Sequence, residues 1–205
     1  MFRDGTEALV ISLALSVLSA LPDRLGSGSA VTLFAGHFYN PDTGKNFLGL
    51  KSPTAKTNAV SNYNDAKNAL ADYQYLANAD EEALKKIGCM LHFIQDASEP
   101  HHSSNVIANP LNNSHGEFEE YTYNIIDNII PCSVNHTYAV MQAYSSVSVE
   151  ELVDFTATIS HLFIDSVNDV KDKSDWYIVA DECVDLATSF STIILYKLLK
   201  AKHVI

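Results

Sequence analysis

The sequence predicts an all-α protein built as a single multi-helix domain. Several stretches carry apolar residues three or four positions apart, and no stretch shows sustained alternation of apolar and polar residues with hairpin turns. The chain has 205 residues, of which 47% are hydrophobic and 19% are charged. It can therefore bury one sizeable core, and its composition favours globular order. We expect one domain spanning residues 1–205.

An apolar run from Ala8 to Leu21 lies near the start of the sequence. It has about the length of a signal-peptide core and is too short to cross a bilayer comfortably. Arg3 is the only basic residue before it, Asp4 and Glu7 oppose that charge, and no clean cleavage site follows Ala20. We expect a buried first helix here, with a signal peptide as the alternative.

The rest of the chain alternates between turn-rich segments and helical periodicity. Asn40, Pro41 and Gly44 indicate tight turns after a Gly/Ser-rich loop. Asp80 is a predicted N-cap, and Pro100 is expected to stop the helix that Asp80 begins. Helices are expected at about 53–77, 81–96, 116–130, 149–170 and 180–200.

His92 and Asp96 stand four apart in a predicted helix. Residues at this spacing project from the same helical face, about one turn apart. Zinc accepts imidazole nitrogen and carboxylate oxygen, so the pair has chelating geometry. Alone, such a pair is as often an ordinary contact on a helix surface.

The same pattern recurs at His115 and Glu119, with His101 and His102 in the loop between the two pairs. His37 lies upstream in an aromatic, turn-forming segment. A catalytic zinc ion needs three protein ligands and an open position for water. These histidines and carboxylates suffice for two metal ions in a cleft between helices.

Four segments together resemble the zinc-dependent bacterial phospholipase C family. They are His-Phe-Tyr-Asn-Pro-Asp-Thr-Gly at 37–44, Leu-His-Phe-Ile-Gln-Asp at 91–96, Pro-His-His at 100–102 and the pair His115 and Glu119. Members of that family bind three zinc ions in an all-helical domain. The resemblance implies a first zinc ion on His37, His92 and Asp96, and a second on His102, His115 and Glu119. His101 would be a neighbour of these ligands.

The resemblance also implies roles for residues nearer the N-terminus. Asp23 lies where the family has a catalytic aspartate, although a helix-ending turn explains Asp23 equally well. Phe34 lies where the family has an aromatic side chain that faces a choline headgroup. The second aromatic position of choline-specific members is Arg24 here, which weakens any cation–π recognition of choline.

A third zinc site is the main departure from the family. There it uses the mature N-terminus and a histidine of the first helix, with the aspartate equivalent to Asp96 as a bridge. No histidine precedes His37 here, although Glu7 lies at about the right place to substitute. Either this chain begins later than its relatives or it keeps only two metal ions.

The net charge of the chain and its resemblance to the phospholipase C family together limit the partners that we expect. The formal net charge of −12 argues against stable binding of nucleic acid, which needs clustered Lys and Arg. We expect a monomeric phospholipase C that releases diacylglycerol and a phosphorylated headgroup from a phospholipid, with peripheral membrane contact. The resemblance implies an extracytoplasmic location. The alternatives are a related single-strand zinc nuclease and an inactive zinc-binding member of the family.

Overall fold

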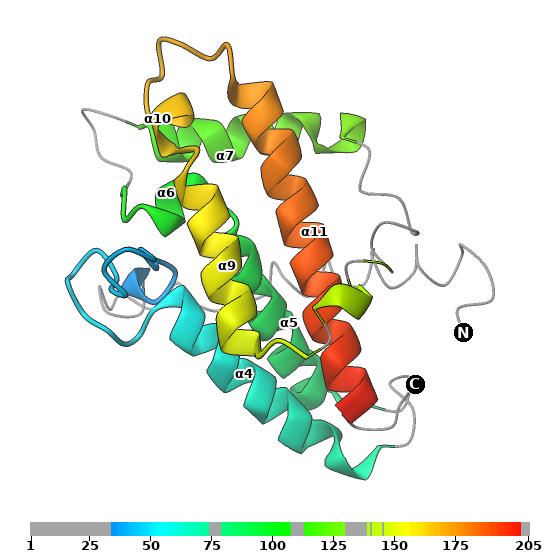
Figure 1. Ribbon diagram of the computed structural model, residues 1–205. Coiled ribbons are helices and arrows are strands. Elements are labelled where there is room, and N and C mark those ends of the chain that lie inside the picture. The colour runs from blue at the N-terminus through cyan, green and yellow to red at the C-terminus, as the bar shows by residue number, and fades with distance from the viewer. Residues whose placement is uncertain are drawn as a thin grey trace.

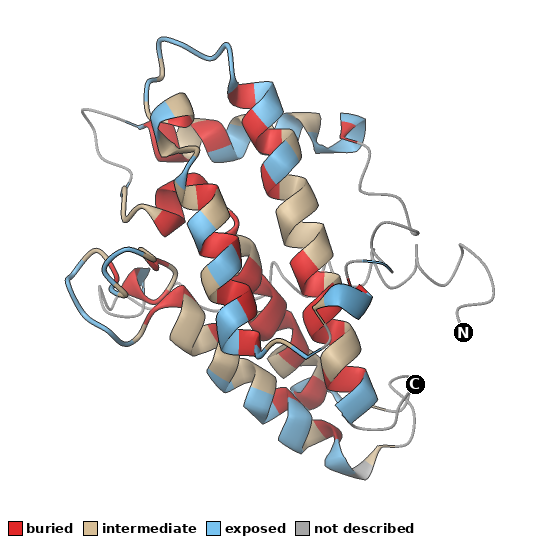
Figure 2. Cartoon of the chain, in the orientation of Figure 1, coloured by how far each residue is buried: buried red, intermediate tan, exposed pale blue. Residues whose placement is uncertain are grey.

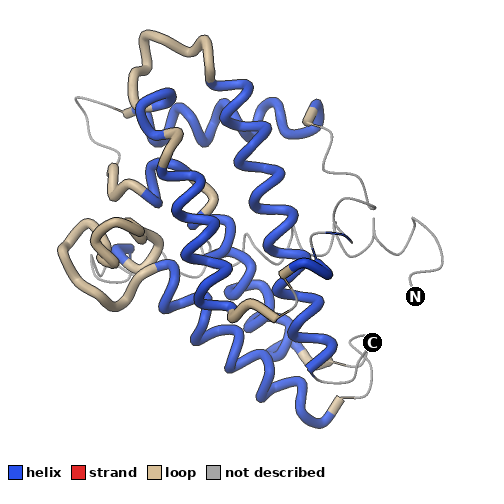
Figure 3. Tube along the Cα trace, viewed as in Figure 1, coloured by secondary structure: helices blue, strands red, loops and turns tan. Residues whose placement is uncertain are grey.

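The protein is all-helical in the part that its computed structural model describes, which confirms the predicted fold class (Figures 1 and 3). The described residues are 34–73, 79–107, 113–129, 139, 141–144 and 146–201. Within these ranges there is no strand, only an isolated bridge between Asn40 and Lys45. The predicted first helix over Ala8–Leu21 lies outside them.

Among the described residues, the helices come in the following order along the chain. They are α4 (Ala55–Ala69), η1 (Leu70–Asp72), α5 (Glu81–Ala97), α6 (Pro100–Ser103), α7 (Ser114–Ile125), η3 (Ile126–Asn128), α9 (Val149–His161), α10 (Ile164–Val167) and α11 (Trp176–Ala201). No helix among the described residues is long and apolar enough to cross a membrane.

Side-chain caps determine where the central helices begin. The Asp80 carboxylate accepts a hydrogen bond from the Ala83 amide at 2.9 Å, as expected of the N-cap of α5. That helix ends at Ala97. Pro100 follows three residues later and opens the short helix α6, where its missing N–H costs nothing. Helix α6 therefore begins three residues after α5 ends, and the two helices are in contact.

Four predicted helices have different bounds in the structure. The helix predicted over 116–130 spans Ser114–Ile125 and continues only as the 3-10 turn Ile126–Asn128. The helix predicted to run to residue 77 ends at Ala69, and a 3-10 turn follows that buries Leu70 completely. The helix predicted over 149–170 breaks at Leu162, from which the chain turns so that Val167 packs into a second core cluster. Helix α11 begins at Trp176, four residues earlier than predicted, because the fully buried Trp176 ring anchors its first turn.

Two clusters of buried apolar side chains form the core, and α11 contributes to both (Figure 2). The larger joins α4, α5, α9 and α11 and includes Leu91, Leu152 and Ile194, each fully buried. The smaller joins α7, α10 and α11 around Phe118 and Trp176. Helix α5 packs against α4, α9 and α11, so the face of α5 that carries His92 and Asp96 has a fixed position.

Candidate metal centre

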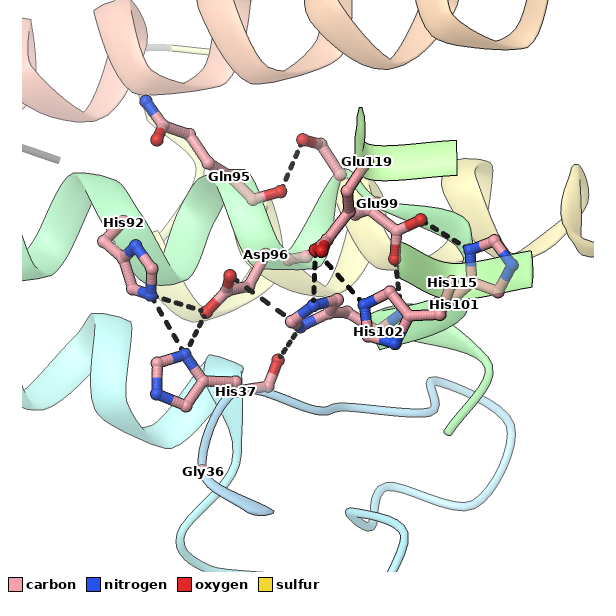
Figure 4. A network of polar contacts seen from close by, with 12 residues as sticks. Gly36, His37, His92, Gln95, Asp96, Glu99, His101, His102, His115 and Glu119 are labelled. Atoms are coloured by element: carbon pink, nitrogen blue, oxygen red, sulfur yellow. Dashed lines mark hydrogen bonds and ion pairs between the residues drawn. The ribbon is translucent and has the colours of Figure 1, made fainter. Parts of the chain in front are cut away.

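Helix α5 places His92 and Asp96 on one face, and the segment before α4 brings His37 to them (Figure 4). His92 Nε2 lies 3.2 Å from Asp96 Oδ2. His37 Nδ1 lies 2.9 Å from that same oxygen and 2.9 Å from His92 Nε2. We call these three residues the first ligand group. His92 and Asp96 are buried, and His37 is partly buried.

Hydrogen bonding cannot satisfy all three contacts of the first ligand group at once. Each ring nitrogen carries at most one proton, which points at one acceptor. The distances of 2.9, 2.9 and 3.2 Å place the three atoms on a circle of radius about 1.7 Å. A zinc ion with bonds of about 2.0–2.1 Å can therefore touch all three from just above their plane. The donor set and its spacing fit a metal ion.

A second ligand group lies on α6 and α7. Glu119 Oε1 is 3.4 Å from His102 Nε2 and 3.2 Å from His115 Nε2. His115 and Glu119, four residues apart on α7, therefore meet His102 of α6. His102 Nδ1 donates to the His37 carbonyl oxygen at 2.8 Å. That bond turns His102 Nε2 toward the carboxylate, as outer hydrogen bonds orient metal-binding imidazoles.

Glu99 also meets this second group, and the pattern of the sequence did not single it out. Its carboxylate, with His102 and His115, forms a set of possible ligand atoms that all lie within 4.8 Å of one another. However, Glu99 Oε1 lies 2.7 Å from His101 Nδ1, and Oε2 accepts from the His102 amide at 2.8 Å. We therefore take Glu119 as the carboxylate of the second ligand group and Glu99 as the side chain that caps α6.

His101 is completely buried behind the second ligand group. Its Nδ1 contacts Glu99, and its Nε2 lies 3.2 Å from Ser114 Oγ. Its ring stacks on His115 with centroids 5.2 Å apart and an interplanar angle of 5°. Both nitrogens of His101 are thus engaged away from Glu119, whereas His102 faces it.

Without a metal ion, the surroundings of the two groups favour ionised Asp96 and Glu119 and a protonated His102. Burial works to raise the Asp96 pKa, but His92, His102 and His37 hold it below its usual value. Burial likewise opposes protonation of His102, yet Asp96, Glu119 and Glu99 raise its pKa from 6.5 to about 10. The pKa of Glu119 is lowered, against its own burial, by His102 and His115.

One ring nitrogen of the second ligand group is buried without a hydrogen-bond partner among the described residues. His115 Nδ1 is solvent-inaccessible and has no hydrogen-bond partner in the described part of the chain. Leaving a buried polar atom unpaired costs about 1–3 kcal/mol. A cation at Nδ1 would satisfy this atom, whereas a cation at Nε2, the nitrogen that faces Glu119, would leave Nδ1 unpaired.

Comparison with known proteins supports the resemblance. No protein-family model matches the chain. A phospholipase C of Paraclostridium bifermentans is 33% identical over 100 residues, which are 46% of this chain and 24% of that protein. The alpha toxin from Clostridium absonum superposes with a TM-score of 0.76 at 22% identity, over 91% of this chain and 53% of the toxin. The alpha-toxin of Clostridium perfringens avian strain SWCP gives 0.68 at 20% identity, over 92% and 54%.

The chain is similar in sequence to part of a bacterial phospholipase C and similar in fold to two clostridial alpha toxins. It spans about half the length of the two toxins and about a quarter of the curated phospholipase C. The structural likeness concerns the fold alone.

Only one of the remaining candidate site residues falls within the described part of the chain. The Phe34 ring is 51% exposed, with its centroid 6.4 Å from that of His37. It therefore lies beside the first ligand group, where a substrate could reach it. Asp23, Arg24 and Glu7 lie outside the described residues. The catalytic role of Asp23 stays a prediction.

Proposed function

We propose that the protein is a zinc-dependent phospholipase C that hydrolyses the phosphodiester bond between diacylglycerol and the headgroup. The observation that carries this proposal is the convergence of two His/carboxylate groups on Asp96. One carboxylate oxygen contacts His37 and His92, and the other lies 3.7 Å from His102 Nδ1. Two neighbouring cations would neutralise a phosphodiester, which suits a substrate that carries negative charge.

His37, His92 and Asp96 would hold one zinc ion, and His102, His115 and Glu119 a second. Zinc bound there supplies Lewis-acid chemistry, which polarises phosphoryl oxygens and makes hydroxide available near neutral pH. Each group offers three protein ligands, the number found in catalytic zinc sites that keep one position open. A third zinc ion remains an expectation that depends on residues outside the described ranges.

The side chains around the two groups have separate tasks in this proposal. The His37 carbonyl fixes the orientation of His102, and Asp96 stays ionised because its pKa is lowered. Asp23 is the proposed general base for the attacking water. Phe34 presents an exposed ring beside the first group and would contact the headgroup or glycerol portion of the lipid.

The test combines metal analysis with two substrates. We expect about two zinc ions per chain and hydrolysis of a dispersed short-chain phosphatidylcholine, with little cleavage of single-stranded DNA. His92→Ala removes a ligand of the first group and should abolish lipid hydrolysis while one zinc ion is lost. His161→Ala is the matched control, because His161 lies outside both groups and contacts Ser104 Oγ at 2.8 Å.

Each alternative has its own result. Faster cleavage of DNA than of lipid would make the protein a single-strand nuclease. Two zinc ions without hydrolysis of any phosphodiester would make it a non-catalytic metal-binding protein. Full lipid hydrolysis by the His92→Ala variant would refute the metal centre itself.

A further inference from the structure

A short loop beside the first ligand group exposes apolar side chains between two lysines. The residues are Lys-Asn-Phe-Leu-Gly-Leu-Lys at 45–51, which we call the Lys45–Lys51 loop. Leu48 is 41% exposed and Leu50 is 40% exposed. The loop lies beyond the start of α4, at the edge of the bundle (Figure 1).

Hydrogen bonds of the Asn46 side chain fix the loop in the conformation that exposes these leucines. The Asn46 side chain is 2% exposed, and its Oδ1 accepts hydrogen bonds from the amides of Leu48 at 3.0 Å and Leu50 at 3.1 Å. Its Nδ2 donates to the Pro53 carbonyl oxygen at 2.7 Å. Gly49 at the tip has a φ of 76°, which a residue with a side chain rarely adopts. The exposure of the leucines is therefore a property of a fixed turn.

The segment that contains the loop is positively charged, whereas the whole chain is negatively charged. Residues 43–64 contain three lysines and no Asp or Glu, whereas the full sequence carries a formal net charge of −12. Lys56 is paired with Asp154 at 3.2 Å. Among the described residues, Lys45 and Lys51 have no carboxylate within ion-pair distance, so their charges remain available to a partner.

Aromatic ring contacts connect the loop to the candidate metal centre. The Phe47 ring contacts the Phe34 ring, with centroids 5.8 Å apart. The Phe34 ring in turn lies 6.4 Å from that of His37. A lipid surface in contact with the exposed leucines would therefore lie close to the first ligand group.

We infer that the Lys45–Lys51 loop is a docking surface for a phospholipid bilayer that carries anionic headgroups. Leu48 and Leu50 enter the apolar edge of the headgroup layer, and Lys45 and Lys51 pair with anionic headgroups around them. The functional reason for this surface rests on the proposed phospholipase activity, because it would present lipid to the metal centre. Binding itself requires no turnover.

The test measures how the zinc-loaded full chain partitions onto sedimented vesicles of phosphatidylcholine with and without phosphatidylglycerol. We expect stronger binding to the anionic vesicles, weakened by high salt. Leu48→Ser/Leu50→Ser should lower the partition coefficient by about tenfold or more. Lys45→Gln and Lys51→Gln should each lower it about fivefold on anionic vesicles only. The matched control is Tyr177→Ser/Ile178→Ser, which removes two side chains that are 47% and 62% exposed on α11.

Zinc content and melting temperature of every variant should match those of the wild-type protein, which separates loss of binding from misfolding. Equal loss of binding in the α11 control, or wild-type partition of all three loop variants, would overturn the inference. So would a failure of the wild-type protein to bind either kind of vesicle. Loop-dependent binding without lipid hydrolysis would support the docking surface and refute the proposed activity, and the reverse result would do the opposite.

Discussion

His102 should remain protonated far above neutral pH in the metal-free protein. Its Nδ1 lies 3.7 Å from Asp96 Oδ1 and its Nε2 lies 3.4 Å from Glu119 Oε1. Although burial opposes the charge, these carboxylates and Glu99 raise the His102 pKa to about 10. At pH 8.5 about 97% of His102 should carry a proton, compared with about 1% of a histidine at the ordinary pKa of about 6.5.

The assay is a pH titration of metal-free protein labelled with ¹⁵N at histidine, followed by the nitrogen chemical shifts of His102. Glu119→Gln removes one of the negative charges and should lower the His102 pKa. Replacing Glu150, whose closest ion-pair partner is Lys56 at 3.8 Å, by Gln is the matched control and should leave it unchanged. If His102 titrates near pH 6.5 in the wild-type protein, the electrostatic reasoning is wrong.

The raised pKa has a definite consequence for stability. A proton bound more tightly in the folded state stabilises that state, and this contribution is fully present below about pH 6.5. It is lost as the pH rises through about 10. Zinc competes with the same proton at Nε2, so the apparent zinc affinity of the second ligand group should increase about tenfold per pH unit over that interval.

Three further predictions concern the stability of the fold and its loss at acidic pH. Leu152→Ala empties a fully buried position and should lower the free energy of unfolding by about 2–5 kcal/mol in urea denaturation. Ser148→Ala removes the capping box of α9 and should cost about 1 kcal/mol without changing zinc content in elemental analysis. Asp96 and Glu99 have lowered pKa values, so their stabilisation exists above about pH 4 and should disappear on further acidification of the metal-free protein, measured by circular dichroism.

Helical periodicity was enough to predict the fold class and the two His/carboxylate pairs. A spacing of four on an α-helix determines which side chains share a face before any tertiary contact is known. His92 with Asp96, and His115 with Glu119, therefore approach each other as the pattern indicated. The distinction between His101 and His102 came from the family resemblance, since adjacent histidines give no periodic signal.

The boundaries of the helices and the place of Glu99 depended on tertiary structure. Helix α9 ends where distant segments meet: Ser160 Oγ donates to the Ala97 carbonyl oxygen at 2.7 Å, and Val167 beyond the helix packs into the second core cluster. Glu99 stands three residues after Asp96 and directly before a proline, which indicates a helix end rather than a ligand. The position of Glu99 at the start of α6 brings its carboxylate toward His102 and His115.

The two ligand groups are physically one unit, which bears on how the centre could act. Asp96 faces both groups through its two oxygens, and His37 gives its ring to the first group and its carbonyl oxygen to His102 of the second. Residues joined by shared partners do not contribute independently to stability or binding. A substitution of Asp96 or His37 should therefore disturb both ligand groups, whereas a substitution of Glu119 should disturb mainly the second.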